Sequence, residues 1–491
     1  MGQAPANFLL RLKRTFRVSK PFNQNFIVGC ILFCLPGIYL ALTGLGAGGG
    51  QPSSQDVAST TNAIVYGLFT LFGWIGGSIL NLLGPKLTIM IGAVGYPMYV
   101  GGLWYFDRQG HAWFPYFAGV ILGCSAGCLW TAAGFIQFAY AEEKEKAQER
   151  FITWQWALTS FGGTVGSLVA FGVNFNEKTA TGVSNAVYVV FIVIMCLAIV
   201  LAAVLIIDPK RVVRDDGTHI AIFKKATITT EVRGVFELFT DWKVLVLVPG
   251  IFVAEMCLAL MSSINAYYFN LRTRSLNNVL FQFIMCPAPL ALSYVMDTTK
   301  VKSRRLRGLL GTAIMGTVCL ATCSGLLAWI RRNHVDQTVI RTTGADWTDS
   351  GFAAGFVLYI LFGMVYSTYQ LVVQWTLAAL TNDPVKCARY AGMFKGTTSL
   401  GMCVAFILDS KKVSYTIQLV VQFALYLVGL VCLFSIIWFC VADTNYFVEE
   451  SVIVPKHVEE QAVLTGVVAK EQIEREHEKE RIAEAKVTGR G

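Results

Sequence analysis

The chain has 491 residues, of which 55% are hydrophobic and 14% are charged, and its mean hydropathy is +0.55. A soluble domain carries roughly a quarter charged residues, so this composition excludes an ordinary soluble domain and favours a membrane protein. The net charge of +9 resides mainly in alternate connections between apolar segments, so it indicates membrane topology and not nucleic-acid binding.

Twelve apolar segments follow one another along the chain, and each can cross a hydrocarbon core of roughly 30 Å as a helix. They cover about residues 26–46, 63–83, 87–106, 113–139, 156–174, 186–207, 244–268, 276–296, 307–330, 351–380, 391–409 and 415–442. Lys and Arg concentrate in the N-tail and in the even-numbered connections, which predicts cytoplasmic termini. We therefore expect an all-α membrane protein with twelve transmembrane helices.

The segments divide the chain into five parts. We expect a cytoplasmic basic N-tail (1–25), an N-terminal six-helix bundle (26–207), a cytoplasmic central loop (208–243), a C-terminal six-helix bundle (244–442) and a cytoplasmic charged C-tail (443–491). The central loop includes the stretch Phe236-Glu-Leu-Phe239, which favours a short amphipathic helix. The tail has a helix-forming composition but too few apolar positions to pack a core, so we expect it to be solvated.

The same break occurs in two of the apolar segments. Pro36-Gly37 interrupts the first segment, and Pro249-Gly250 interrupts the seventh, 213 residues later, with similar neighbours on each side. A proline inside a spanning helix removes a backbone hydrogen bond that lipid does not replace. The recurrence predicts a duplicated unit, and these four residues are candidates for bends that ease a conformational change.

A second recurrence favours the same duplication. Arg150-Phe151 precedes a Thr-Ser pair in the fifth segment, and Arg389-Tyr390 precedes a Thr-Ser pair in the eleventh. Every matched position is 239 residues from its counterpart. Segments 1, 4 and 5 thus correspond to segments 7, 10 and 11, which predicts two pseudo-symmetric six-helix bundles arranged as parallel repeats.

This organisation resembles the major facilitator superfamily. The pattern G-x-x-x-D-R-x-G-R-R, which that family carries between helices 2 and 3, can be laid on this chain from Gly77 to Lys86. Asn81 stands at the acidic position, so the charge lock normally made by this motif lacks its acid in the first half. The counterpart after the eighth segment keeps the acid as Asp297.

Within the superfamily, the chain most resembles the uncoordinated-93-like branch in its fungal form. The residues that carry the resemblance are Asn23-Gln-Asn-Phe-Ile-Val-Gly29, Leu45-Gly-Ala-Gly-Gly49, Leu83-Gly-Pro-Lys86, Glu149-Arg-Phe151 and Trp154-Gln155. The resemblance covers the membrane region but not the tails. It implies either secondary transport or the regulation and escort of another membrane protein.

Glu255 is the clearest candidate for a functional residue. It follows the second Pro-Gly break, at the position where the first half has Leu42. An ionised carboxylate near mid-membrane costs several kcal/mol unless it is paired, hydrated or protonated, so such a group can bind and release a proton. Alignment with the first helix predicts a position in the outer third of the membrane. The alternative role is a structural acid that is hydrogen-bonded to another helix.

Lys395 is the second charged candidate for the substrate or proton pathway. Its repeat partner is Trp156, which is itself a candidate for aromatic contacts with a solute. Because Lys395 lies about five residues inside the predicted eleventh helix, we expect its ammonium group to snorkel to the cytoplasmic surface. A pair with Glu255 would require that the two residues lie at the same depth.

Amide side chains complete the candidate pathway. Gln137 lies on the fourth helix, and Gln370 and Gln374 share one face of the tenth; these helices usually line the cavity in this fold. Asn265 is a further amide candidate in the seventh helix. The alternative role for each is an interhelical hydrogen bond. Aromatic contacts could come from Tyr39, Trp130, Tyr366 and Tyr369.

The sequence carries no pattern for hydrolytic chemistry. All five histidines lie outside the predicted spans, and neither a phosphate-binding loop, a nucleophile elbow nor a metal-ligand spacing is present. We therefore expect neither an enzyme nor a resident cofactor or metal.

The leading hypothesis is a secondary transporter of a small solute that works by alternating access, with proton coupling through Glu255. The alternative is a non-transporting regulator or trafficking escort. The predicted partners are the lipid bilayer, an unidentified small-molecule substrate and a membrane protein, in a plasma membrane or endomembrane.

Overall fold

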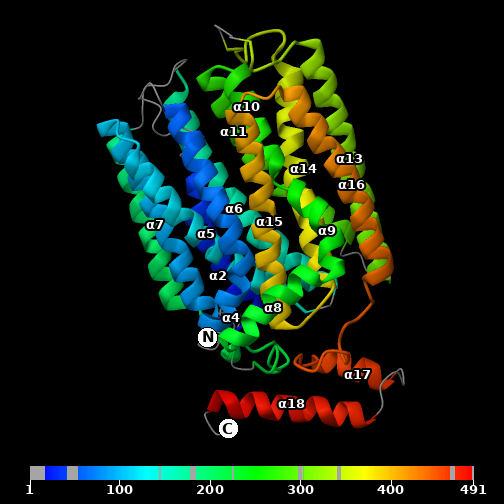
Figure 1. Ribbon diagram of the computed structural model, residues 1–491. Helices are drawn as coiled ribbons and strands as arrows, with labels where there is room; N and C mark the ends of the chain where they lie inside the picture. Colours follow the sequence, from blue (N-terminus) through cyan, green and yellow to red (C-terminus); the bar gives the residue numbers. More distant parts are fainter. Residues whose placement is uncertain are drawn as a thin grey trace, which may run out of the picture.

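A computed structural model describes residues 17–40, 54–142, 145–176, 184–223, 226–296, 301, 303–339, 344–464 and 470–488. Within these ranges, ten helices are long and apolar enough to cross a membrane, and Figure 1 shows the long helices running side by side in one bundle. Leu42 and Asp297 lie outside the described residues, as does the side chain of Arg150.

The first half contains five long helical elements. They are α2 (Pro21–Leu32) with the π-helical turn η1 (Phe33–Gly37), α4 (Ser54–Gln109), α5 (Trp113–Ala139), α6 (Glu145–Asn174) and α7 (Asn185–Leu205). The helix α4 holds the second and third predicted spans, and α6 holds the fifth. The arrangement in this half is therefore consistent with six predicted spans.

The second half follows a short connecting segment. This segment holds η2 (Pro209–Arg211) and α8 (Ile228–Thr240). The half itself consists of α9 (Trp242–Val253), α10 (Met256–Tyr268), α11 (Leu271–Ile284), α12 (Pro287–Met296), α13 (Arg304–Arg332), α14 (Phe352–Ala379), α15 (Pro384–Ser410) and α16 (Tyr415–Cys440). The pairs α9/α10 and α11/α12 each form one broken span, so this half also accounts for six spans.

The two halves pack their fifth spans against their first spans in the same way. A Cβ atom added at Gly162 of α6 would lie 2.4 Å from the carbonyl oxygen of Phe33, and one added at Gly401 of α15 would lie 1.9 Å from that of Phe252. Both distances are too short for any side chain, so the helix backbones touch. Gly162 and Gly401 are 239 residues apart, which is the offset of the sequence repeat.

Gly84 separates the two spans inside α4 and has a positive φ of 77°. No atom lies within 4 Å of a Cβ atom added there, so replacement by alanine would strain only the backbone. We predict that Gly84→Ala lowers the free energy of unfolding by about 1 kcal/mol, because left-handed backbone disfavours a side chain. Gly101→Ala is the matched control, since Gly101 is helical and also has open space around it. Equal unfolding midpoints for the two variants in one detergent would contradict this prediction.

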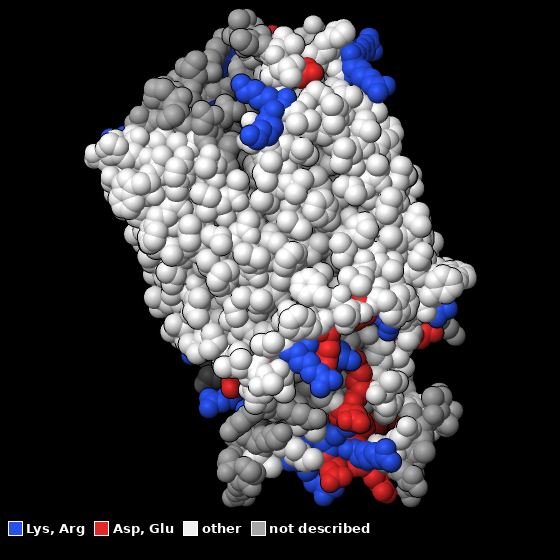
Figure 2. All heavy atoms as spheres, in the orientation of Figure 1, with Lys and Arg blue, Asp and Glu red and all other residues white. Residues whose placement is uncertain are grey.

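Charged side chains gather at the two ends of the bundle, and the visible face between them is almost free of charge (Figure 2). The long helices also carry large exposed apolar residues, such as Leu197 and Val200 of α7 and Val431 of α16. Such a surface is stable next to hydrocarbon and not next to water. The chain is therefore an integral membrane protein whose bundle faces the lipid bilayer.

The C-terminal tail is not solvated throughout, which corrects the expectation from composition. Its residues Tyr446, Val452 and Val454 form a small buried cluster. The tail also hydrogen-bonds to the connecting segment, where the backbone N–H of Ile222 donates to the carbonyl oxygen of Ser451 at 2.9 Å. The error arose because these few apolar residues pack on a neighbouring segment and need no core of their own.

Two helices, α17 (Lys456–Leu464) and α18 (Lys470–Thr488), follow the buried part of the tail. Together with α8 they lie at the same end of the bundle as the start of α2 (Figure 1). We call this end the linker end. The carboxyl group of Glu480 on α18 lies 2.6 Å from Nδ1 of His219 in the connecting segment. The tail is thus bound to the segment that joins the two halves.

Candidate functional site

A cavity lies between the two halves of the bundle. The bend at Pro36 contributes to its wall, as do charged side chains from the second half. Aromatic residues form much of the wall, and they are Tyr39, Tyr66, Phe69, Tyr96, Trp130 and Trp156 of the first half and Tyr366 of the second. An apolar cavity with a few polar groups is the usual form of a site for a small molecule.

Two opposite charges meet in the wall of this cavity. The ammonium group of Lys395 lies 3.0 Å from the Glu255 carboxylate, and the two side chains are only 7% and 8% exposed. Gln370 joins the pair, because its amide donates to Glu255 at 3.3 Å and its carbonyl oxygen accepts from Lys395 at 3.4 Å. Each charge therefore has a partner of opposite sign and a further hydrogen bond, which offsets the cost of burial.

The position of Lys395 corrects the sequence-based expectation of snorkelling. The helix α15 begins at Pro384, seven residues before the predicted eleventh span, so Lys395 lies eleven residues inside it. The prediction missed the first turns because they are polar, with Lys386 and Arg389 among them. At this depth the ammonium group reaches Glu255 and not the end of the bundle.

Glu255 also lies deeper than its alignment with the first helix predicts. It occupies the break between α9 and α10, at the midpoint of the span Trp242–Tyr268. Pro249 lies inside α9 shortly before this break. A carboxylate at the middle of a membrane span is costly when it is alone, so its pairing with Lys395 is required for burial in the ionised form.

The charge pair of the second half contacts the aromatic wall of the first half. The Lys395 ammonium group lies 4.3 Å from the ring centre of Trp130 and 5.7 Å from that of Trp156, at distances where cation–π attraction is effective. The indole N–H of Trp130 donates to the Tyr96 hydroxyl group at 3.2 Å. The indole N–H of Trp156 is buried and has no hydrogen-bond partner among the described residues.

All four predicted amide candidates are absent from the wall of this cavity, and of these Gln370 alone contacts the charge pair. Gln137 donates a hydrogen bond to the Gln155 side chain, and Asn265 contacts the Asn277 side chain and the Arg274 carbonyl oxygen. Gln374 is buried on α14. In contrast, the wall residues Tyr66 and Tyr96 were not singled out from the sequence, because nothing in their local pattern distinguishes them from packing residues.

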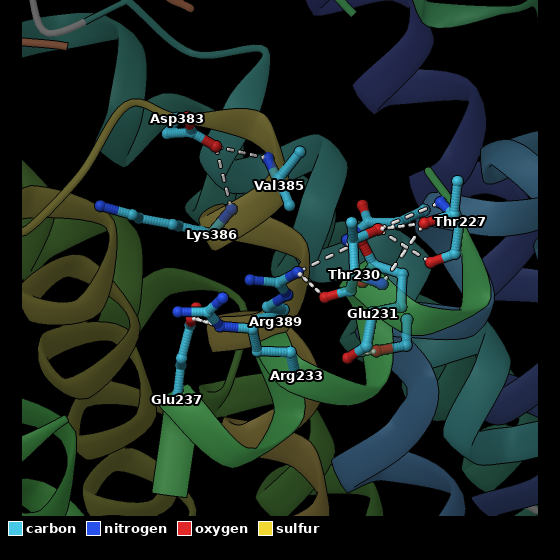
Figure 3. A network of polar contacts seen from close by, with 11 residues as sticks. Thr227, Thr230, Glu231, Arg233, Glu237, Asp383, Val385, Lys386 and Arg389 are labelled. Carbon is cyan, nitrogen blue, oxygen red and sulfur yellow. Dashed lines mark hydrogen bonds and ion pairs between the residues drawn. The ribbon is translucent and has the colours of Figure 1, made fainter. Parts of the chain in front are cut away.

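A second cluster of charged residues joins the halves at the linker end (Figure 3). The Glu231 carboxylate of α8 accepts a hydrogen bond from the Asn81 amide of α4 at 3.0 Å and from the Arg389 guanidinium group of α15 at 3.2 Å. The Glu231 side chain is 4% exposed. A carboxylate from the connecting segment therefore bridges the two halves. It lies beside Asn81, the uncharged residue at the acidic position of the loop motif.

Glycine permits this close approach of the halves. A Cβ atom added at Gly77 of α4 would lie 2.6 Å from Cα of Arg389, and one added at Gly234 of α8 would lie 1.9 Å from the Arg389 guanidinium carbon. Sequence reasoning proposed Gly77, Asn81 and Arg389 separately as structural residues but missed Glu231. The apolar residues of α8 recur at helical spacing on one face, and Glu231 lies on the other face. This pattern is the sequence signal that could have identified Glu231.

The bends near the two Pro-Gly pairs differ in their packing. Pro36 lies in the π-helical turn η1, and a Cβ atom added at Gly37 would lie 2.9 Å from the backbone of Gly162. Pro249 lies within α9, and a Cβ atom added at Gly250 would meet the Tyr369 hydroxyl group at 3.2 Å. Both glycines therefore allow a bent first helix to pack closely on its neighbours.

Two repeated helical halves around a cavity with a buried charge pair define a membrane protein of the major facilitator fold. In agreement, the structure is similar to the crystal structure of the fucose:proton symporter FucP of E. coli, with a TM-score of 0.58 and 12% identity over 85% of this chain and 99% of that one. A FucP structure in the outward conformation gives the same TM-score. The predicted all-α fold class of two pseudo-symmetric bundles is thereby confirmed.

The family model described as "Ion channel regulatory protein UNC-93" matches residues 57–434, and the chain belongs to this family. An uncharacterized membrane protein of Schizosaccharomyces pombe is 46% identical over 406 residues, which are 83% of this chain and 82% of the relative. UNC93-like protein 1 of Arabidopsis thaliana is 34% identical over 433 residues, which are 88% and 93% of the two chains. The resemblance to the uncoordinated-93-like branch is thus confirmed.

Proposed function

We propose that the protein is a secondary transporter that moves a small solute through the central cavity by alternating access. The observation that carries the proposal is the Glu255–Lys395 pair in the wall of a cavity between two repeated halves. Rocking of one half against the other would expose this cavity to each side of the membrane in turn. The bends at Pro36 and Pro249 would ease that motion, and the linker end would face the cytoplasm.

The charge pair can couple the movement of a solute to that of a proton. A proton on Glu255 removes the negative charge that holds Lys395, and the ammonium group then becomes available to an acceptor on the solute. The cavity is therefore suited to a small, partly apolar solute that carries hydrogen-bond acceptors. Release of the proton restores the ion pair and expels the acceptor.

Proton coupling is tested by Glu255→Gln in proteoliposomes. The amide keeps the size of the side chain but does not bind or release a proton at neutral pH, so we expect solute-driven proton flux to fall at least about a hundredfold, the lower end of the usual scale for loss of a group that transfers a proton. A panel of small solutes, screened by thermal shift, supplies the solute for this assay.

Asp409→Asn is the matched control for the loss of an acid. Asp409 belongs to α15 but accepts its hydrogen bond from Ser263 and does not line the cavity. We expect this variant to keep its proton flux. Unchanged flux in Glu255→Gln would remove the coupling role.

The second candidate function is a non-transporting regulator or escort of another membrane protein. The description of the matching family as ion channel regulatory favours it. It predicts that a stable membrane-protein partner is recovered in mild detergent and that no solute in the panel shifts the unfolding temperature. A clear thermal shift that depends on Glu255 and Lys395 would favour transport.

A further inference from the structure

The helix α8 has one apolar face that the other described parts of the chain leave largely exposed. Ile228, Val232, Phe236 and Phe239 follow one another at helical spacing, and they are 72%, 52%, 69% and 36% exposed. The opposite face buries Glu231, Gly234 and Leu238. A mutual side-chain cap between Thr227 and Thr230 fixes the start of the helix. The helix is therefore amphipathic, with its apolar side outward, which is unfavourable in water.

The position of α8 relates this face to the membrane. The helix packs across the ends of α4 and α15 and beside α9 (Figure 1). Phe239 contacts the Trp74 ring edge to face at 5.5 Å, and Trp74 belongs to the part of α4 that spans the membrane. After α8 the chain continues into the spanning helix α9 through Trp242 and Leu245, which are exposed apolar residues. The apolar stripe is thus continuous with the lipid-facing surface.

The inner face of α8 forms the bridge between the two halves. Glu231 accepts hydrogen bonds from Asn81 of the first half and Arg389 of the second. The backbone carbonyl oxygen of Thr230 also accepts a hydrogen bond from Arg389, at 3.4 Å. The lipid-facing stripe and the bridge lie on the same short helix of 13 residues, so a force on one face displaces the other.

We propose that α8 is a lipid-anchored latch. Its apolar stripe docks in the headgroup region of the bilayer at the linker end, and this docking holds the Glu231 carboxylate between Asn81 and Arg389. The physical basis is that an amphipathic helix lies in the membrane interface with its apolar face buried about 5–10 Å deep. Without the lipid contact, α8 leaves its place across the ends of α4 and α15, and the two halves separate at this end. The inference rests on the alternating-access proposal only for its effect on transport.

The lipid contact is tested in the full-length protein in phosphatidylcholine nanodiscs. An encoded nitroxide amino acid is placed at Phe236 on the apolar stripe or at Glu237 on the polar side, and its collisions with oxygen and with a water-soluble nickel chelate are measured. We expect the ratio of oxygen to nickel accessibility to be at least about threefold higher at position 236. Equal ratios, or protection of position 236 from both reagents by another protein surface, would overturn the lipid contact.

The latch is tested by the distance between the two halves. Nitroxides at Leu83 of α4 and Lys386 of α15 report this distance by pulsed electron resonance, and both positions are exposed. We expect Val232→Ser/Phe236→Ser to raise the population with a longer distance at least about threefold, and Glu231→Ala to do the same, because each breaks one face of the latch. Glu237→Gln is the matched control, since the exposed Glu237 side chain pairs with the exposed Arg233 and contributes nothing to the bridge at Glu231.

The lipid contact of the apolar stripe and the bridge at Glu231 can be tested separately. A wild-type distance distribution in both the stripe variant and Glu231→Ala would overturn the proposal. A wild-type distribution in the stripe variant alone would show that lipid does not hold Glu231 in place, which also overturns it. These distances require no substrate. A protein that fails to transport any solute can therefore still confirm the latch, and the failure of either proposal is recognised on its own.

Discussion

Replacing Lys395 with methionine is expected to destabilise the protein by about 3–5 kcal/mol, because it leaves the Glu255 carboxylate buried without its cation. The carboxylate would retain only one hydrogen bond of those described, from Gln370. The size of the side chain is nearly conserved, so a cavity contributes little to the loss. The measurement is the denaturant midpoint of the purified protein in one mild detergent, followed by the fluorescence of its tryptophans.

A double replacement separates the effect of the lost charge from that of the lost packing. In Glu255→Gln/Lys395→Met neither charge remains, so most of the stability should return, since well-packed neutral groups commonly replace a buried ion pair without loss. Proton coupling should stay absent in the double variant. If the double variant is as unstable as Lys395→Met, the unpaired Glu255 charge is not the cause of the lost stability. That result would contradict the prediction.

The fold was largely predictable because membrane helices are determined by local sequence. Long apolar segments identify the spans, and the offset of 239 residues between matched positions identifies the two halves. The error in the start of α15 has a local cause as well. Asp383 caps this helix by accepting hydrogen bonds from the backbone N–H groups of Val385 and Lys386. The pair Asp383-Pro384 is a helix-start signal in the sequence. It was missed because the predicted span was bounded by its apolar residues alone.

The candidate site was less predictable because its contacts join distant parts of the chain. Glu255 and Lys395 are 140 residues apart, and their pairing depends on helix positions that the apolar pattern sets only within several residues. Glu231 lies 150 residues from Asn81 and 158 residues from Arg389. No local sequence pattern predicts contacts between residues so far apart. The sequence therefore indicated which residues could be functional, but not which residue each one contacts.

Gly396→Leu is expected to have the second large effect, because Gly396 lies where the two halves touch along α4 and α15. A Cβ atom added at Gly396 would lie 2.4 Å from the Trp74 ring and 2.8 Å from the carbonyl oxygen of Thr70. On the facing helix, a Cβ atom added at Gly73 would lie 2.6 Å from Cα of Gly396. The two backbones therefore leave no space for a side chain between them.

Leucine at position 396 must push α4 and α15 apart, and such overpacking costs about 1–3 kcal/mol. Because this contact joins the halves and lies outside either bundle, each half should keep its own packing while the closed arrangement is lost. We expect normal helical content by circular dichroism and a lower unfolding midpoint. Transport, where a solute is found, should fall at least about tenfold, the equivalent of about 1.4 kcal/mol in a barrier.

Gly172→Leu is the matched control, because Gly172 of α6 is exposed and has no atom within 4 Å of an added Cβ atom. Both variants add the same side chain to a long helix of the bundle, at a tightly packed position in Gly396→Leu and at an open one in Gly172→Leu. A midpoint for Gly396→Leu equal to that of Gly172→Leu would mean that the halves do not depend on this contact. A lower midpoint with intact helices would place the moving boundary of the protein between α4 and α15, the two helices whose ends α8 packs across.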